Sequence, residues 1–228
     1  MIITILAAPV LDIRTIMASP QFSSSVQLIL ALALISLVPF FLISVTSFLR
    51  IIIVFSLLRT AVGTQQVPPN SVLIGLALFM TVFIMSPVWQ EANQKALIPY
   101  DQGKLSQAKA IEIGMKPLSQ FMLKQTREKD LALFVQFSKI PPPKTADEVP
   151  YHVLIPSFMI SELKTGFQIG FLLFVPFIVI DLVVANILLS LGMFMLSPVM
   201  VSLPFKILLF VLVDGWNLIT RGLLMSFR

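Results

Sequence analysis

Cysteine is absent from the 228 residues, and histidine occurs only once, as His152. A chain without thiols forms no disulfide, has no thiolate nucleophile and offers zinc no cysteine ligand. A single histidine excludes a histidine-rich metal site, and any Ser-His-Asp triad would have to use His152. We therefore expect no metal site and no cofactor.

Charged residues are also scarce, at 12% of the chain, whereas hydrophobic residues make up 57% and the mean hydropathy is +0.95. Soluble domains carry about 25% charged residues. So much apolar surface predicts a membrane-associated protein. Sixteen of the 27 formal charges lie between Trp89 and Pro150, nine basic and seven acidic. Because the signs are mixed, this region is not a basic stripe for nucleic acid.

Four hydrophobic segments predict an all-α protein built from helical hairpins. They cover residues 26–48, 72–89, 167–191 and 203–219, and the first two lie inside uncharged runs longer than the roughly 20 residues of a spanning helix. Interior proline removes a helix hydrogen bond and bends the helix. Kinked or broken helices are therefore expected, with prolines in or beside the segments at Pro39, Pro87, Pro176, Pro198 and Pro204.

The segments divide the chain into four parts: an N-terminal arm or cleaved signal segment (1–25), a first hydrophobic pair (26–90), a polar, mostly helical region (91–150) and a second hydrophobic hairpin (151–228).

Within the polar region we expect two helices between residues 104 and 140, because Gly114 weakens a helix and Pro117 suits a first turn. An irregular linker is expected over 141–149. Residues 49–71, with Arg50 and Arg59, are interpreted as a loop, and the charges of the loops do not fix an orientation in the membrane.

Charges inside the second hairpin need partners. If the hairpin turns at Met193–Phe194, Asp181 and Lys206 lie at the same depth, twelve residues on either side. This predicts an ion pair; the alternative is that each faces water or a neighbouring subunit. Glu162 and Lys164 are two residues apart and face different directions on a helix.

Asp214 has no such partner at its depth, because Lys206 lies eight residues away, about 12 Å along a helix axis. We expect its partner, or water, to come with another chain. A proton relay, as in transporters, is the alternative.

Met193, Phe194 and Met195 form an apolar triplet at the predicted turn. Such a triplet either packs as in any hairpin turn or forms a soft ring that narrows a pore. No motif of a protease, hydrolase or nucleotide-binding enzyme occurs in the sequence, so we expect no enzyme.

Four stretches carry a resemblance to a known family: SFLRIIIVFSLLRTAVGTQQVPPNSVLIGLALF (47–79), FMLKQTREKDLALF (121–134), SELKTGFQIGFLLFVPFIVIDLVVA (161–185) and LPFKILLFVLVDGW (203–216). They resemble the FliP/SctR family, the export-gate proteins of type III secretion. The last two are shared with the injectisome homologue SctR, whereas the first two look more like the flagellar members.

The resemblance implies a channel subunit rather than an enzyme. It implies about five copies of the chain, joined with FliQ, FliR and FlhB-like subunits in a helical, cone-shaped complex in the inner membrane and flagellar basal body. Unfolded flagellar proteins would pass through this pore, with residues 91–150 on the periplasmic side. An injectisome subunit or, from another class, a proton-coupled transporter subunit are the alternatives.

The family also has a Met-rich loop that seals the closed pore, and it matches Met193, Phe194 and Met195. This chain places Phe194 where the commoner pattern has a third methionine. We interpret Glu162, Lys164, Asp181, Lys206 and Asp214 as structural or inter-subunit charges rather than catalytic residues.

Overall fold

The computed structural model describes residues 24–138, 145 and 148–227. These residues form helices joined by turns, and no strand occurs among them, so the all-α prediction is confirmed. The predicted N-terminal arm lies outside the described residues except for its last two positions. Most of the predicted linker 141–149 lies outside them too.

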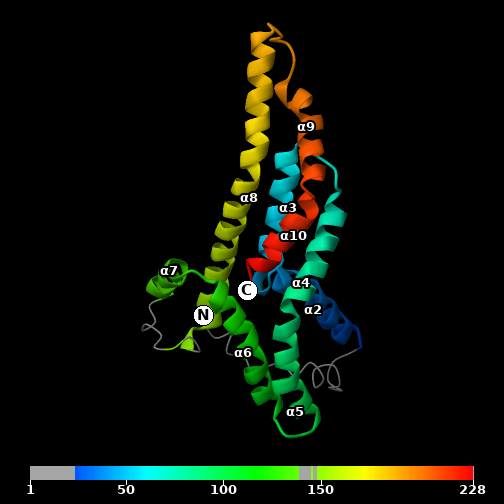
Figure 1. The fold of residues 1–228 in the computed structure, drawn as a ribbon. Coiled ribbons are helices and arrows are strands. Elements are labelled where there is room, and N and C mark those ends of the chain that lie inside the picture. The colour runs from blue at the N-terminus through cyan, green and yellow to red at the C-terminus, as the bar shows by residue number, and fades with distance from the viewer. Residues whose placement is uncertain (1–23, 139–144, 146–147, 228) are drawn as a thin grey trace.

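Nine α-helices and one π-helical segment make up the described chain. In order they are α2 (Ser24–Val45), α3 (Phe48–Val62), α4 (Asn70–Ala92), η1 (Asn93–Leu97), α5 (Ile98–Asp101), α6 (Gln107–Gln125), α7 (Glu128–Ser138), α8 (Tyr151–Ser190), α9 (Pro198–Leu212) and α10 (Gly215–Met225). The molecule is elongated: α8 and α9 reach one end, and α5 closes the other (Figure 1).

Helix α3 corrects the interpretation of residues 49–71 as a loop. The chain leaves α2 at Val45, turns at 46–47 and enters α3, which ends at Gly63 in the left-handed conformation that glycine favours. Most of α3 is buried in the centre of the molecule, between α8 and α4 (Figure 1). The sequence misled because Arg50 is a buried, paired charge rather than a solvated one.

The helix breaks do not coincide with the prolines. Four of the five named prolines lie inside continuous helices, and the fifth begins α9. The first and fourth hydrophobic segments are broken as expected, but at 46–47 and 213–214, and α9 and α10 meet at 63°. The third forms part of α8, whose 40 residues span about 60 Å.

The prediction of two helices in the polar region is confirmed, with a different boundary. Helix α6 continues through Gly114 and Pro117, and the break lies at 126–127. A Cβ on Gly114 would lie 3.2 Å from the Cβ of Ala96, so this glycine allows α6 to approach η1 closely. It serves helix packing here rather than helix termination.

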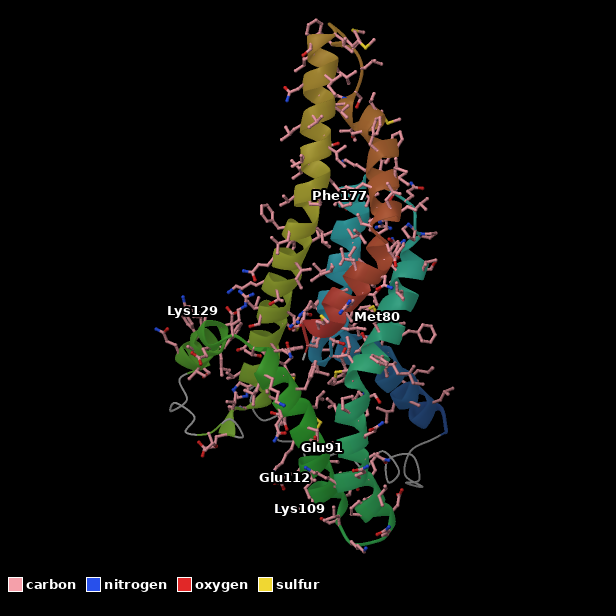
Figure 2. All side chains as sticks on the ribbon, viewed as in Figure 1. Met80, Glu91, Lys109, Glu112, Lys129 and Phe177 are labelled. Carbon is pink, nitrogen blue, oxygen red and sulfur yellow. The ribbon has the colours of Figure 1, made fainter. Side chains whose placement is uncertain are left out.

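Two buried clusters form the core. One joins α3 with α4, α8, α9 and α10, around Ile51, Val54 and Phe55. The other joins α4, α6 and the first turns of α8, around Met122 and Phe158. Figure 2 shows Met80 and Phe177 in the central region and the charged residues Glu91, Lys109 and Glu112 toward the α5 end.

Much apolar surface remains outside these clusters. Three helical stretches are long and apolar enough to cross a membrane, Leu28–Val45, Asn70–Asp101 and Tyr151–Ser190, and α9 with α10 makes a fourth if the bent pair counts as one span. Phe171 and Leu172, for example, are each about two-thirds exposed. This surface is that of a membrane protein.

Candidate functional site

The turn between α8 and α9, residues 191–197, forms the tip of a long hairpin at one end of the molecule (Figure 1). Helix α8 ends in a Schellman motif: Met193 N–H donates to Leu188 O at 2.9 Å, and Gly192 N–H donates to Leu189 O at 3.1 Å. Gly192 has φ +73°, which an L-residue rarely adopts. This glycine turns the chain out of the helix just before the apolar triplet.

The triplet points away from both cores. Phe194 is 76% exposed and Met195 is 99% exposed, while Met193 is about half exposed. Bulky apolar side chains at the tip of a membrane hairpin are available to another protein chain or to a second copy of this one. The position predicted for the triplet, at the hairpin turn, is confirmed; its sealing role stays a prediction.

Asp181 and Lys206 meet across the hairpin, as the twelve-residue symmetry predicts. Lys206 Nζ donates to Asp181 Oδ2 at 2.6 Å and to the carbonyl of Ala61 at 3.4 Å. The Ser202 hydroxyl donates to the other oxygen of Asp181. Because the Lys206 side chain is 5% exposed, this pair fixes α9 against α8 and α3 at one register.

Glu162 forms the most buried ion pair, with Arg50. The Arg50 guanidinium holds the carboxylate in a two-pronged contact through Nε and Nη2. It also donates to Gln125 Oε1 at 2.9 Å, to the Ser226 carbonyl at 2.9 Å and to the Ser226 hydroxyl at 3.0 Å. All five guanidinium N–H donors are therefore satisfied, as a buried arginine requires.

The end of the described chain closes over this guanidinium. The Phe227 ring lies 3.9 Å from Arg50 Cζ, in cation–π geometry, and stacks on Phe121 with ring centroids 6.3 Å apart. Arg50 consequently ties α3, α6, α8 and the residues after α10 to one point. The network is structural, since every one of its groups is already satisfied within the chain.

Lys164 faces away from Glu162, as predicted, and pairs with Asp130 of α7. The Ser161 hydroxyl donates to the same carboxylate at 2.8 Å. Burial alone would raise the pKa of Asp130, but the hydrogen bonds from Lys164 and Ser161, helped by the charges of Lys164 and Arg127, lower its pKa below the usual value. These bonds hold α7 on the side of α8.

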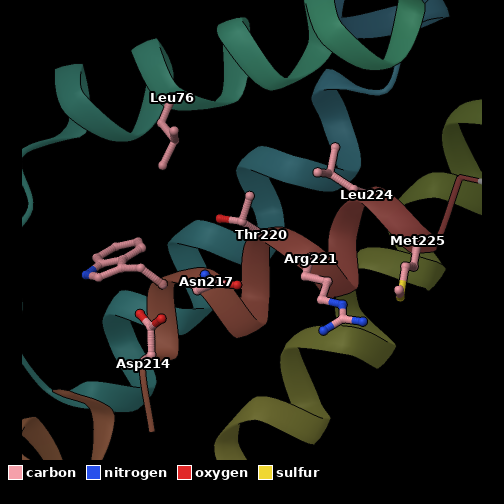
Figure 3. Close-up of a pocket in the computed structure, with 8 residues that line it drawn as sticks. Leu76, Asp214, Asn217, Thr220, Arg221, Leu224 and Met225 are labelled. Atoms are coloured by element: carbon pink, nitrogen blue, oxygen red, sulfur yellow. The ribbon is translucent and has the colours of Figure 1, made fainter. Parts of the chain in front are cut away.

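Asp214 sits at the break between α9 and α10, in the left-handed conformation with φ 50°. Aspartate tolerates this conformation better than most residues. Its side chain is exposed and makes no ion pair with any residue that the structure describes. It lines an open pocket between α4 and α10, together with Trp216 and Arg221 (Figure 3).

Helices α3 and α8 approach closely at two glycines that the sequence analysis did not single out. A Cβ on Gly170 would lie 2.2 Å from Leu57 Cδ1, and one on Gly166 would lie 3.1 Å from Ile53 Cγ2. The Gly166-x-x-x-Gly170 spacing is the small-residue signature of membrane helix pairs. It was therefore a signal available in the sequence.

The partners Arg50, Asp130 and Ser202 were also missed, because each is distant in sequence from the acid or base that it contacts. Only the serine had a local cue: it lies four residues before Lys206, on the same helix face. Among the described residues, no group of three or more histidine and acidic side chains is arranged to hold a metal ion.

The family model and the similar proteins found by comparison all carry the same name, FliP. Residues 31–223 match the FliP family. Flagellar biosynthetic protein FliP of Bacillus subtilis is 54% identical over 205 residues, which cover 90% of this chain and 93% of that protein. The protein of the same name from Pectobacterium carotovorum is 53% identical over 207 residues, covering 91% of this chain and 80% of that protein. The protein of the same name from Caulobacter vibrioides is 52% identical over 203 residues, which cover 89% of this chain and 76% of that protein. This chain, with its apolar helices and its charge-paired hairpin, belongs to the FliP family.

Proposed function

We propose that the chain is a core subunit of the flagellar type III export gate in the bacterial inner membrane and basal body. Several copies, about five, join FliQ, FliR and FlhB-like subunits in a cone-shaped complex, and unfolded flagellar proteins pass through its channel. The chain is not an enzyme in this account, and the driving energy comes from partners. The relatives are named as flagellar biosynthetic proteins, which favours the flagellar over the injectisome alternative.

One observation carries the proposal: a bare apolar tip, Met193 to Met195, stands at the end of a hairpin whose register is locked by a buried ion pair. A ring of such tips would close a narrow apolar constriction that excludes water and ions. Phe194 is as bulky and apolar as the methionines on either side, so it supports the seal. It adapts less to a passing chain than methionine would.

The transporter alternative needs a membrane carboxylate that is free to take up and release protons. Asp181 is engaged by Lys206 and Ser202, which makes it a poor relay and a good structural tie. Glu162 is likewise fully engaged by Arg50. Of the three carboxylates, only the exposed Asp214 has no ion pair with the described residues and could act as a relay, so the pairings of Asp181 and Glu162 favour the passive pore.

The test is a mass measurement on the complex extracted in mild detergent through an affinity tag on this chain. The proposal expects a large particle that contains several copies of this chain and the FliQ-like and FliR-like subunits. A strain that lacks the chain should also fail to export flagellar proteins. A stable monomer that transports a small solute after reconstitution alone would contradict the proposal.

A further inference from the structure

An open pocket of about 680 Å³ lies between α4 and α10. Figure 3 shows Leu76 of α4 across from α10, with Asp214 and Arg221 in separate parts of the pocket. The polar side chains of Asn217 and Thr220 lie between the two charges in sequence, and Leu224 and Met225 extend the apolar lining. Trp216 is held in place by edge-to-face contacts with Phe55 and Phe210 at centroid distances of 6.4 and 5.4 Å. The pocket is therefore a groove with a rigid aromatic wall and two opposite charges.

Neither charge has a side-chain partner in the part of the chain that the structure describes. Asp214 and Arg221 are both exposed, and neither makes a side-chain hydrogen bond or ion pair with the residues described here. Helices α4 and α10 also expose large apolar side chains that do not line the pocket: Phe79 is 79% exposed, and Leu218 is 62% exposed. Charges set in such a surface are expensive at membrane depth unless something pairs with them. Two unpaired charges of opposite sign therefore call for an occupant with both complementary signs.

The spacing of the charges indicates the shape of the occupant. Asp214 and Arg221 are seven residues apart, about 10.5 Å along the axis. One small charged group, such as a single ammonium or phosphate, would satisfy only one of them. A neighbouring helix presents side chains to its partner every seven residues, with apolar positions between, and so matches both charges and the apolar lining at once.

We propose that this groove binds a helix from a different subunit of the complex. That helix carries a basic residue opposite Asp214, an acidic residue seven positions away opposite Arg221, and apolar residues between them. The proposal rests on the proposed function, because it needs a multi-subunit complex, and it adds the site and the chemistry of one contact.

A second copy of the chain does not offer such a helix outside α10 itself. Among the residues that the structure describes, Asp214, which directly precedes α10, and Arg221 are the only acid and base that lie seven residues apart. An antiparallel α10–α10 contact would satisfy both charges, but it joins only two copies and closes. A larger ring of copies leaves the groove to another kind of subunit.

The experiment places a photo-crosslinking amino acid at Asn217, between the two charges, and illuminates the complex in intact cells before purification. Mass spectrometry of the crosslinked peptide should identify a helix of a different subunit with a basic and an acidic residue seven apart. A crosslink to α10 of a second copy, a crosslink to lipid alone, or no crosslink in an intact complex would each overturn the proposal.

Charge reversal tests the same contact. Arg221→Glu should reduce recovery of the crosslinked subunit by about tenfold or more, because it opposes two like charges. The reciprocal change of the acidic residue in that subunit to arginine should restore recovery. Lys116→Glu, an exposed lysine of α6 without an ion pair among the described residues, is the matched control and should have no effect. Full recovery with Arg221→Glu would overturn the proposal.

The outcome also separates this inference from the proposed function. If the wild-type chain purifies without other subunits, the proposed function fails. If the complex purifies intact but position 217 contacts no second kind of subunit, only the groove assignment fails.

Discussion

Arg50 carries the largest number of contacts of any single side chain in the network described above, and its removal would leave the Glu162 carboxylate buried without a counter-charge. Breaking a buried ion pair from one side costs about 3–5 kcal/mol, whereas replacing both partners by apolar groups is often nearly neutral. Replacing one member of this pair should therefore destabilise the chain more than replacing both members together.

We expect Arg50→Met to destabilise the chain by about 3–5 kcal/mol, because Glu162 loses its partner and Gln125 and Ser226 lose a donor. The double variant with Glu162→Leu should be clearly more stable than the sum of the two single changes predicts. Denaturant unfolding in detergent measures all three. Strict additivity would show that the two side chains do not act as a pair.

Asp181 and Lys206 give a second residue-scale prediction, measured by assembly of the complex. Asp181→Ala leaves Lys206 buried without its counter-charge, so assembly should fall sharply. Adding Lys206→Ala should make assembly no worse, with a coupling energy of about 1–3 kcal/mol. Native gel analysis of the detergent-extracted complex reports the yield. If the losses of assembly from the two single changes simply add in the double variant, the two residues do not act as a pair.

Helix packing sets the prediction at the scale of elements. Gly170→Ala places a Cβ against Leu57 at the contact of α3 and α8, and overpacking of this kind costs about 1–3 kcal/mol. Gly222→Ala is the matched control: nothing lies within 4 Å of its Cβ, and alanine favours the helix by about 1 kcal/mol. Unfolding midpoints should fall for the first variant and stay or rise for the second. Equal effects would contradict the close approach.

The docking of α7 should depend on pH through Asp130. Because the pKa of this carboxyl is lower in the folded chain than its ordinary value of 3.8, the stabilisation is complete above that pH and is lost as the pH falls through the lower folded value. Hydrogen exchange of α7 amides, corrected for intrinsic rates, should show protection at pH 5 that decreases below about 3.8. In Asp130→Asn this pH dependence should disappear. Its persistence would assign the effect to another group.

At the scale of elements, the sequence predicts the helices that follow from hydrophobic runs and the ion pair that follows from the symmetry of one hairpin. Asp181 and Lys206 are found by counting from the turn, because both arms are helices with the same rise. Arg50 and Glu162, 112 residues apart, follow no such rule. A charged residue beside an apolar run predicts a loop as long as the residue that pairs with the charge is unknown. The sequence therefore predicts a loop where α3 lies.

Across the whole molecule, the two ends have different characters. The α5 end carries charged residues such as Glu91 and Lys109, while the opposite end carries the apolar tip (Figure 2). The distribution of charge along the sequence predicts this difference between the two ends, since most charges fall in residues 91–150. The prolines do not predict where these helices break, because Pro39 and Pro204 lie inside α2 and α9, whereas the breaks fall at 46–47 and 213–214.

The central claim is that the tip formed by Met193, Phe194 and Met195 seals a closed export pore. The most direct measurement is ion leakage across the membrane of cells that carry alanine at all three positions. The account predicts an assembled complex with increased ion leakage. The control is Phe83→Ala, which changes an exposed aromatic residue of α4 away from the tip and should not increase ion leakage. An assembled triple variant with no added leakage would contradict it.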